Sequence, residues 1–405
     1  MKIRAITGFI DPKWPLQKGS LKLLSACMLA CKESLVSIGY DVQTLRLATP
    51  SPCRQEKPIP ASDLVAYARA LEAEAFVHGL DYVSIGPACP EEMSGYHIIP
   101  KLLEATETVF SSGIIAESDT GVHLEAARAC GHIIADNAIL SPDGFMNLRF
   151  AALANVHPGT PFFPASYHDG GTPSIAIATE AADVALNVIF QSRSLSDTRK
   201  FFIQEIERHT AAIELVLTRI TAEHSIQFTG IDFSLAPYPA GGRSFGGALQ
   251  ALGIPAAGLS GSAAASAFLA SCIDDAHFQR TGFSGLFFPI LEDSVLAARN
   301  SQGLISISDL LLYSTLCGTG LDTIPLPGDT SPEALTAVLI DVGAIALRHN
   351  KPLTARLMPI PDKQAGDPIE FDFEYFAPSH VMRLDSQPLS GMMAGTDPLP
   401  VAPRA

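Results

Sequence analysis

The chain has 405 residues, a formal net charge of −15 at pH 7, and a composition that is 47% hydrophobic and 17% charged. This composition excludes a disordered or fibrous protein, and the length suits one large α/β domain or two smaller ones. The acidic balance argues against nucleic acid or an anionic membrane as a partner, because both attract basic surfaces. We therefore expect a well-buried globular protein whose acidic charge serves solubility.

The first residues, MKIRAITGFI, have the alternation of a strand and lack the apolar core and cleavage site of a secretory signal. No run of about 18 apolar residues predicts a membrane helix. Seven cysteines are scattered along the chain without a CxxC pair, and Cys27 and Cys31 lie in a helical pattern that favours packing over metal binding. These features indicate a reduced, cytoplasmic protein.

In chain order, strand patterns alternate with helical ones. Helices are expected at 18–38, 62–78, from about 91 to 110, from 123, at 196–224, from 244, at 260–272, at 307–316 and from 331. Strands are expected at 2–9, 41–47, 81–86, 113–116, 146–154, 174–179, 231–233, 284–289, 353–359 and 370–376.

The alternation of about ten strands with helices predicts a largely parallel sheet that helices cover. With so many units we expect a closed or nearly closed β/α barrel, because closure removes the edge strands. The barrel is predicted to be a single domain over 1–386, and the Pro- and Gly-rich tail over 387–405 is predicted to be loosely ordered.

One stretch, GIDFSLAPYPAGGRSFGGALQALG at 230–253, combines a short apolar strand, a polar strand end, a Gly/Pro loop and a helix start. This is how α/β proteins build a binding crevice, since strand carboxyl ends and helix amino ends converge there. Asp232 falls within the apolar strand, where an unpaired carboxylate is costly. We expect it to have a partner that is either structural or functional.

Several segments together resemble a known family. They are GIDFSLAPYPA, GSAAASAFLA, FSGLFFPILED, CGTGLDTIPLPGDT and TARLMPIP, with KIRAIT, SDTGVHLEAARACG and SYHDGG upstream. In this order they are similar to the family called domain of unknown function 711, whose members are pyruvate formate-lyase-like. The resemblance covers most of the chain and is most specific between 230 and 370.

The resemblance implies a ten-stranded β/α barrel of two parallel half-barrels, as in the glycyl radical enzymes. The C-terminal stretch VMRLDSQPLSGMMAG lacks their Arg-Val-x-Gly-Tyr type loop, so we expect no glycyl radical. The fold relatives carry a catalytic cysteine on an inner loop, and by this analogy Cys317 is a candidate nucleophile. A packed structural cysteine remains the alternative, because no histidine is near it in sequence.

Ligand groups in a parallel β/α barrel lie at strand carboxyl ends. The candidates for acid, base or metal ligand are His168, Asp232 and Asp322, and Glu292 and Asp293 lie at a similar position, where a helix cap is an alternative. His168 has Asp169 beside it, which can fix its tautomer. The candidates for substrate binding are Ser234, Arg243, Arg356, Glu117, Asp119, Gly241 and Gly242.

The sequence thus predicts an enzyme that acts on a small polar or anionic metabolite by acid–base chemistry inside a barrel, with a divalent metal as a possible cofactor. A non-catalytic metabolite sensor is the alternative, and a cysteine-dependent enzyme using Cys317 is a third hypothesis. Apolar faces on Ala- and Leu-rich helices also predict a homo-oligomer.

Overall fold

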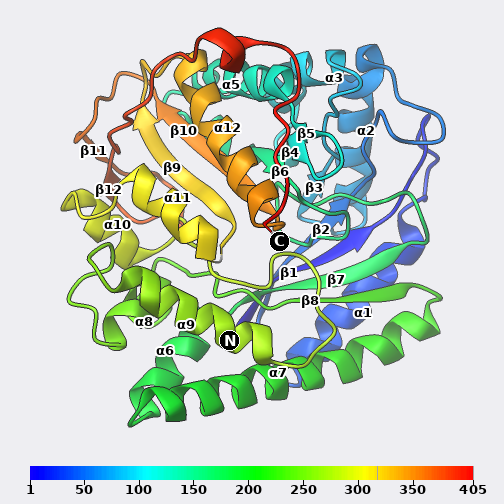
Figure 1. Ribbon diagram of the computed structural model, residues 1–405. Coiled ribbons are helices and arrows are strands. Elements are labelled where there is room, and N and C mark those ends of the chain that lie inside the picture. The colour runs from blue at the N-terminus through cyan, green and yellow to red at the C-terminus, as the bar shows by residue number, and fades with distance from the viewer. Residues whose placement is uncertain (317, 405) are drawn as a thin grey trace.

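A computed structural model describes residues 1–316 and 318–404 of the chain. The protein is an α/β protein whose centre is a ten-stranded mixed sheet, with the order β8-β7-β1-β2-β3-β4-β6-β10-β9 and β5 paired to β4 (Figure 1). Its strands are β1 (Lys2–Phe9), β2 (Val42–Ala48), β3 (Tyr82–Ser84), β4 (Val109–Glu117), β5 (Gly121–Val122), β6 (Phe150–Ala154), β7 (Ser174–Glu180), β8 (Gln227–Asp232), β9 (Gly320–Pro327) and β10 (Leu353–Ile360).

The sheet is mostly parallel but contains two changes of direction. Strands β1, β2, β3, β4 and β6 run parallel to one another. Strand β7 pairs with β1 in the antiparallel sense and carries β8 parallel to itself. At the other side β10 is antiparallel to β6 and carries β9 parallel to itself. The carboxyl ends of β7 to β10 therefore lie at the end of the sheet at which β1 to β4 and β6 begin.

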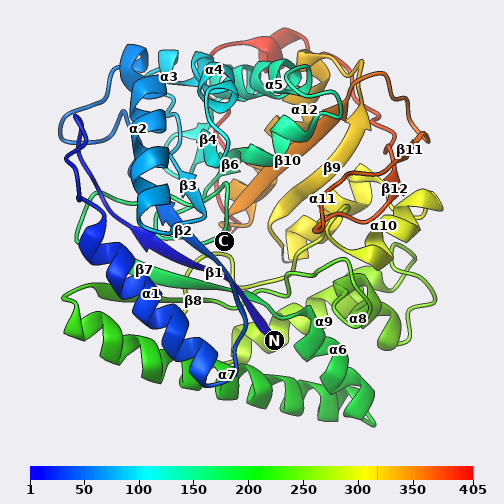
Figure 2. The same ribbon diagram turned by 180° about the vertical axis from the view of Figure 1, so that it is seen from behind.

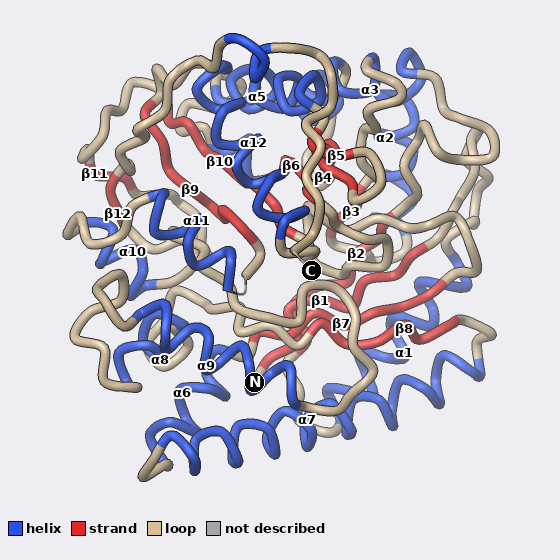
Figure 3. The backbone as a smooth tube through the Cα atoms, viewed as in Figure 1, coloured by secondary structure: helices blue, strands red, loops and turns tan. Residues whose placement is uncertain are grey.

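Helices cover the outer face of the sheet, as Figures 2 and 3 show. Helix α1 packs beside the long helix α7 under β1 and β8, and α5 and α12 pack together over β4 and β10. The helices are α1 (Lys22–Ser37), α2 (Leu64–Val77), α3 (Ser94–His97), α4 (Ile99–Glu104), α5 (Leu124–Ala138), α6 (Ala182–Gln191), α7 (Leu195–Glu223), α8 (Phe245–Ala251), α9 (Ser262–Asp275), α10 (Ser294–Ser301), α11 (Ile307–Leu316) and α12 (Pro332–Arg348).

The alternation of side chains along β2 separates the two faces of the sheet. Leu45 and Leu47 join the large apolar core between sheet and helices. Because successive side chains of a strand point to opposite faces, Thr44 and Arg46 face inward. The inner face carries its own small apolar clusters, one of which contains Ala5, Phe162, Ala178, Ala236 and Phe287. The inner side of the sheet is therefore also a packed environment.

The segment between α9 and α10 lies against both edges of the sheet, one formed by β8 and the other by β9. On the β8 side, Leu235 bridges Leu286, and the Leu235 backbone N–H donates to the carbonyl of Gly285 at 2.9 Å. On the β9 side, Pro289 bridges Asp322, and the Ile290 N–H donates to the Asp322 carbonyl at 3.2 Å. Residues 279–290 thus lie between β8, at one edge of the sheet, and β9, at the other.

Most predicted elements are present, and the differences have local causes. The segment 284–289, expected as a strand, forms only isolated bridges, and 370–376 is a turn whose rings pack on one another. The helix expected to reach residue 110 ends at Glu104, because Val109 already begins β4. Helix α6 was not predicted.

The C-terminal tail, expected to be loosely ordered, is held by hydrogen bonds over part of its length. Leu399 and Val122 exchange two backbone hydrogen bonds of 2.8 and 2.9 Å, and the Arg404 N–H donates to Arg348 on α12. Small strands β11 (Pro368–Ile369) and β12 (Ser379–His380) and the short 3₁₀ helix η3 (Gly391–Ala394) complete this region. The Pro- and Gly-rich composition of the tail indicated mobility. In the structure, however, the backbone N–H and carbonyl of Val122 in β5 form hydrogen bonds with the tail.

Two further properties of the surface concern partners. In the part of the chain that the structure describes, no helix combines the length and the apolar composition needed to cross a membrane. Large apolar side chains are exposed on several helices, including Phe76 and Val77 at the end of α2. The homo-oligomer expected from such faces stays a prediction.

Candidate functional site

A cavity of about 440 Å³ lies on the inner side of the sheet. Its walls include Arg4, Tyr82 and Phe110 near the amino ends of β1, β3 and β4, and Arg46 past the middle of β2. Asp322 of β9, Arg356 of β10 and Glu292 from the loop before α10 also line the cavity. The volume is within the range of sites that hold small-molecule ligands.

Ion pairs run along one wall of the cavity as an alternating chain of charges. The Arg356 guanidinium contacts Asp322 at 2.7 Å and Glu292 at 2.8 Å. Glu292 in turn contacts Arg4 at 3.1 Å, and Arg4 lies 3.7 Å from Glu180 at the end of β7. Every charge in this chain has an opposite neighbour, which offsets the desolvation that burial imposes on it.

Asp322 keeps one carboxylate oxygen available. Both contacts with Arg356 are made by Oδ1, and Oδ2 accepts no hydrogen bond from the described residues. Burial raises the pKa of Asp322, and the Arg356 guanidinium opposes this rise. The short contacts with Arg356 favour the ionised form of the pair. Asp322 thus presents an accepting oxygen on a cavity wall.

Arg46 is a charged residue of the cavity wall that has no carboxylate partner among the described residues. Its Nε donates to the Thr44 hydroxyl at 2.8 Å, and its guanidinium lies over the rings of Tyr82 at 5.7 Å and Phe163 at 5.2 Å. Among the described residues it forms no ion pair, and its two terminal nitrogens donate no hydrogen bond. Burial lowers the pKa of Arg46 to about 10.

Arg149, a further arginine of the cavity wall, differs from Arg46 in its partners. It lies at the end of the 3₁₀ helix η2 (Phe145–Arg149) and donates to the carbonyls of Leu103, Thr106 and Val109. These bonds tie the end of α4 to the start of β4, so its hydrogen-bonding capacity is used within the fold. A guanidinium with free donors, such as Arg46, remains available to a ligand.

Asp232, at the end of β8, has its partner within the fold. Its carboxylate accepts hydrogen bonds from the Ser234 hydroxyl at 2.5 Å and from the backbone N–H groups of Phe283 and Ser284, each at 2.7 Å. It is fully buried and does not line the cavity. Burial raises the pKa of Asp232 to about 7, and these three donors oppose the rise.

These bonds fix the turn at 281–285 against β8. A Cβ on Gly282, whose φ is +62°, would lie 2.1 Å from the Asp232 Oδ2, so the carboxylate fills the space beside the turn. Ser234 also accepts from the Gly285 N–H at 3.1 Å. The geometry of Asp232 and Ser234 is that of a structural clamp.

The glycine loop of the same stretch does not reach the cavity. Gly241 and Gly242 are exposed, with open space around both. Arg243 stacks on the Tyr238 ring at 4.3 Å and contacts Glu180 at 3.3 Å, which attaches it to the outer end of the ion-pair chain. The loop therefore supports the charged wall from outside.

The remaining candidates lie at the carboxyl ends of β1 to β4. Glu117 accepts from both terminal nitrogens of Arg54, at 2.7 and 2.8 Å, and Asp119 is exposed. His168 is buried, with Nδ1 3.2 Å from Asp169 and Nε2 3.2 Å from the Gly171 carbonyl. Burial lowers the pKa of His168, and Asp169 opposes this.

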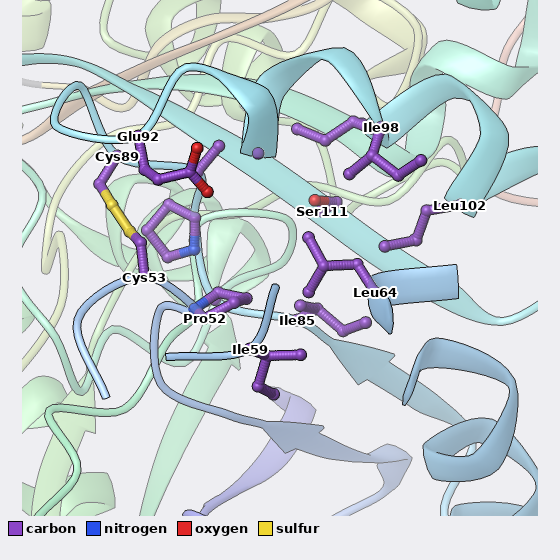
Figure 4. Close-up of a pocket in the computed structure, with 15 residues that line it drawn as sticks. Pro52, Cys53, Ile59, Leu64, Ile85, Cys89, Glu92, Ile98, Leu102 and Ser111 are labelled. Atoms are coloured by element: carbon purple, nitrogen blue, oxygen red, sulfur yellow. A yellow bond between two sulfur atoms is a disulfide. The ribbon is translucent and has the colours of Figure 1, made fainter. Parts of the chain in front are cut away.

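A small cavity of about 20 Å³ lies at this end of the sheet, lined by Ile59, Leu64, Ile85, Leu102 and the disulfide between Cys53 and Cys89 (Figure 4). The expectation of reduced cysteines is wrong for this pair. Cys53 and Cys89 follow different strands and are 36 residues apart, so no local pattern pairs them. Cys317, the candidate nucleophile, lies outside the described residues.

No group of three or more His, Cys, Asp or Glu side chains placed to hold a metal ion occurs within residues 1–316 and 318–404.

The expectation that the candidates meet at one mouth, at the strand carboxyl ends, is wrong. Strands β7 to β10 are antiparallel to β1 to β4 and β6, so the carboxyl ends of the two sets lie at opposite ends of the sheet. The structure brings Asp322, Arg356 and Glu292 together, and places His168, Glu117 and Asp119 elsewhere. Asp293 caps α10 through bonds to Val295 and Leu296, which confirms the alternative given for it.

Sequence reasoning missed Arg4, Arg46 and Glu180. Each is a charged residue within a strand pattern that is otherwise largely apolar. A charge at an inward position of such a strand needs a buried partner or a ligand, and that signal was available. The partners themselves are distant in sequence: Arg4 and Glu292 are 288 residues apart.

These features define an α/β protein with an arginine-lined cavity on the inner side of a mixed sheet. The chain belongs to the family described as Uncharacterised ACR (DUF711), whose model matches residues 1–377.

Curated relatives carry the name UPF0210 protein. The one from Syntrophotalea carbinolica is 28% identical over 368 residues, which are 85% of this chain and 81% of the relative. The one from Pyrobaculum arsenaticum is 31% identical over 356 residues, covering 84% and 78%. The one from Syntrophobacter fumaroxidans is 29% identical over 384 residues, covering 88% and 82%.

Proposed function

We propose that this protein is an enzyme that binds a small anionic metabolite in the cavity and acts on it by acid–base chemistry. Arg46 anchors the anion, and Asp322 is the general base. One observation carries the proposal: the cavity wall holds a guanidinium whose terminal nitrogens, and a carboxylate one of whose oxygens, have no hydrogen-bond partner among the described residues. A guanidinium binds a carboxylate or phosphate through paired, charge-assisted hydrogen bonds.

The surroundings of Asp322 suit the role of a base. Burial raises its pKa, which brings it nearer to neutral pH, where a general base is most effective. Arg356 holds Oδ1 and so fixes the direction in which Oδ2 points. The chain of ion pairs through Glu292 and Arg4 keeps the wall rigid, which supports a preorganised site.

We also propose that the sheet closes into a barrel around this cavity, with residues 279–290 as the closing segment. The bridges that this segment makes to Leu235 on one side and to Asp322 on the other support closure. A barrel wall encloses the ligand on all sides, which excludes water and strengthens charge interactions within the site.

A non-catalytic binding protein is the second candidate. It is favoured by the pairing of the cavity carboxylates with arginine, since Asp322 and Glu292 both contact Arg356. Such pairing holds a carboxylate in its ionised form and opposes proton uptake from a substrate. The two candidates share the same ligand site and differ only in turnover.

Binding is tested by isothermal titration of the full chain with inorganic phosphate, succinate, citrate and 2-naphthoate. The variant Arg46→Met removes the charge and keeps an apolar side chain. Arg54→Met is the matched control, since Arg54 lies at the other end of the sheet. We expect at least one of the four anions to bind the unaltered chain and the control equally, and to bind Arg46→Met at least about 10-fold more weakly.

The proposal is rejected if none of the four anions binds, or if Arg46→Met binds them as tightly as the unaltered chain. Turnover is followed separately by proton NMR of the bound anion. If the protein is an enzyme, we expect Asp322→Asn to keep its affinity for the anion within about 3-fold of the unaltered chain and to lose turnover. If the unaltered chain binds an anion but does not turn it over, the enzyme hypothesis is rejected in favour of the non-catalytic binding protein.

A further inference from the structure

Aromatic side chains are concentrated on the cavity wall. They make up 7% of the chain, yet eight of the 21 lining residues are aromatic. These eight are Tyr82, Phe110, Phe145, Phe162, Phe163, Phe287, Phe373 and Tyr375. Neither an anion anchor nor a general base requires such a wall, so it is a separate property of the site.

The rings come from segments that are far apart in the sequence. Phe162 and Phe163 belong to the loop between β6 and β7, Phe287 to the segment 279–290, and Phe373 and Tyr375 to the turn after β11. Phe162 contacts Phe287 in a tilted arrangement with ring centroids 4.6 Å apart, and Phe145 meets Phe373 edge-on at 5.1 Å. Each segment therefore contributes rings to one shared surface.

The aromatic surface is continuous with the anion anchor. Phe110 contacts Tyr82 and Phe163, in both cases with centroids 5.4 Å apart and the rings steeply inclined. Tyr82 and Phe163 in turn lie against the Arg46 guanidinium. A ligand whose negative group pairs with Arg46 would thus have its adjoining atoms between aromatic rings.

Ordinary core packing does not account for this arrangement. Rings that pack only on one another fill the space between them, because protein interiors are close-packed. Here the rings border about 440 Å³ of free volume, which is room for a two-ring molecule. Aromatic rings prefer offset or edge-on contact with another ring, so an aromatic ligand completes the surface better than a saturated one.

We propose that the ligand is an aromatic carboxylate, with its carboxylate on Arg46 and its ring among Tyr82, Phe110 and Phe163. This inference rests on the proposed anion site and adds the chemical class of the ligand. Arg46 supplies the charge recognition, and the rings select a flat, unsaturated body over an aliphatic one. Asp322 and Arg356 line the same cavity and are then available to another part of the bound molecule.

The test compares matched probes on the unaltered full chain by isothermal titration. Decahydro-2-naphthoate has the same skeleton and charge as 2-naphthoate but no aromatic ring, and 2-naphthamide has the ring but no charge. We expect 2-naphthoate to bind about 3- to 10-fold more tightly than the saturated acid. We expect it to bind at least about 10-fold more tightly than the amide.

A variant pair sharpens the result. Phe163→Leu keeps an apolar side chain beside Arg46 and removes the ring, and Phe76→Leu makes the same exchange at an exposed site on α2. Phe163→Leu should weaken the binding of 2-naphthoate about 3- to 10-fold and leave the affinity for decahydro-2-naphthoate unchanged. Phe76→Leu should change neither affinity.

The outcomes separate the two proposals. If the saturated acid binds as tightly as 2-naphthoate, or if phosphate, succinate or citrate binds through Arg46 while 2-naphthoate does not, the aromatic ligand class is wrong and the anion site stands. If no anion binds, both are wrong. Because the probe comparison uses the unaltered chain, a folding defect in Phe163→Leu does not affect it.

Discussion

The two ends of the sheet carry the same types of residue and differ in what those residues leave available. At the cavity end, Arg46 and Asp322 keep hydrogen-bonding atoms that no described residue uses. At the opposite end, Glu117 is engaged by Arg54, and His168 has a neighbour at each ring nitrogen. The small cavity at that end has a volume of about 20 Å³ and is lined by neither Glu117 nor His168, whereas the cavity beside Arg46 and Asp322 has about 440 Å³.

The comparison teaches that polar residues at strand ends do not identify a site by themselves. A functional site needs polar atoms without partners and enough space for a ligand. Asp232 makes the same point from a third location. It is a buried carboxylate at a strand end, but its oxygens are used by Ser234, Phe283 and Ser284.

The largest expected effect separates two arginines of the same cavity. Arg356→Met leaves Asp322 and Glu292 without their shared cation, so the free energy of unfolding should fall by about 3–5 kcal/mol. Arg46→Met removes a charge that has no carboxylate partner among the described residues, so the free energy of unfolding should stay within about 1 kcal/mol of the unaltered chain. Urea unfolding measures both variants. Equal losses of unfolding free energy in the two variants would contradict the distinction between Arg356, which pairs with two carboxylates, and Arg46, which has no carboxylate partner among the described residues.

The next effect is the pH dependence of the clamp at Asp232. Its folded pKa of about 7 is above the unfolded value of about 3.9. Its contribution to stability is therefore full below about pH 4 and is lost as the pH rises to about 7, by up to about 1.4 kcal/mol per pH unit.

Asp232→Asn cannot titrate and serves as the reference for this contribution. The difference in unfolding free energy between the unaltered chain and Asp232→Asn should decrease between pH 4 and pH 7 and be constant above that range. Urea unfolding at intervals of half a pH unit measures it. A difference that grows with pH would show that the three hydrogen bonds outweigh the burial of the carboxylate.

The smallest effect is expected at the opposite end of the sheet. Glu117→Gln removes the charge that pairs with Arg54 in a partly exposed setting, so the free energy of unfolding should change by about 1 kcal/mol or less. Affinity for 2-naphthoate should not change. Urea unfolding and titration check the two statements. A loss of affinity comparable to that of Arg46→Met would move the site to this end.

Local patterns determined much of the fold. The alternation over 2–9 and 41–47 predicted β1 and β2, and the run from Ser331 to Glu333 predicted the start of α12, which Ser331 caps by accepting from the Ala334 N–H. The periodicity over 196–224 predicted α7 nearly to its ends. These features depend on neighbours within a few residues, so sequence alone contains them.

The residues of the candidate site were predicted only in part. Asp322 and Arg356 were recognised as candidates, and the structure places them in contact. Arg46 was missed because TLRLA is an ordinary alternating strand until the inner face of the sheet is known to enclose a cavity. Asp232 was correctly expected to need a partner, but the donors on the turn at 281–285 are 51 and 52 residues away.

The sequence by itself determined the alternation of strands and helices, the membership of a family and the need for charge compensation inside an apolar sheet. Only the tertiary structure decided which strands run antiparallel. It thereby decided which strand ends lie at the same end of the sheet. Strand direction depends on pairing between segments far apart in the chain, such as β1 with β7 and β6 with β10. For the same reason, only the folded chain distinguishes a carboxylate that holds the fold together from one that remains free to meet a ligand.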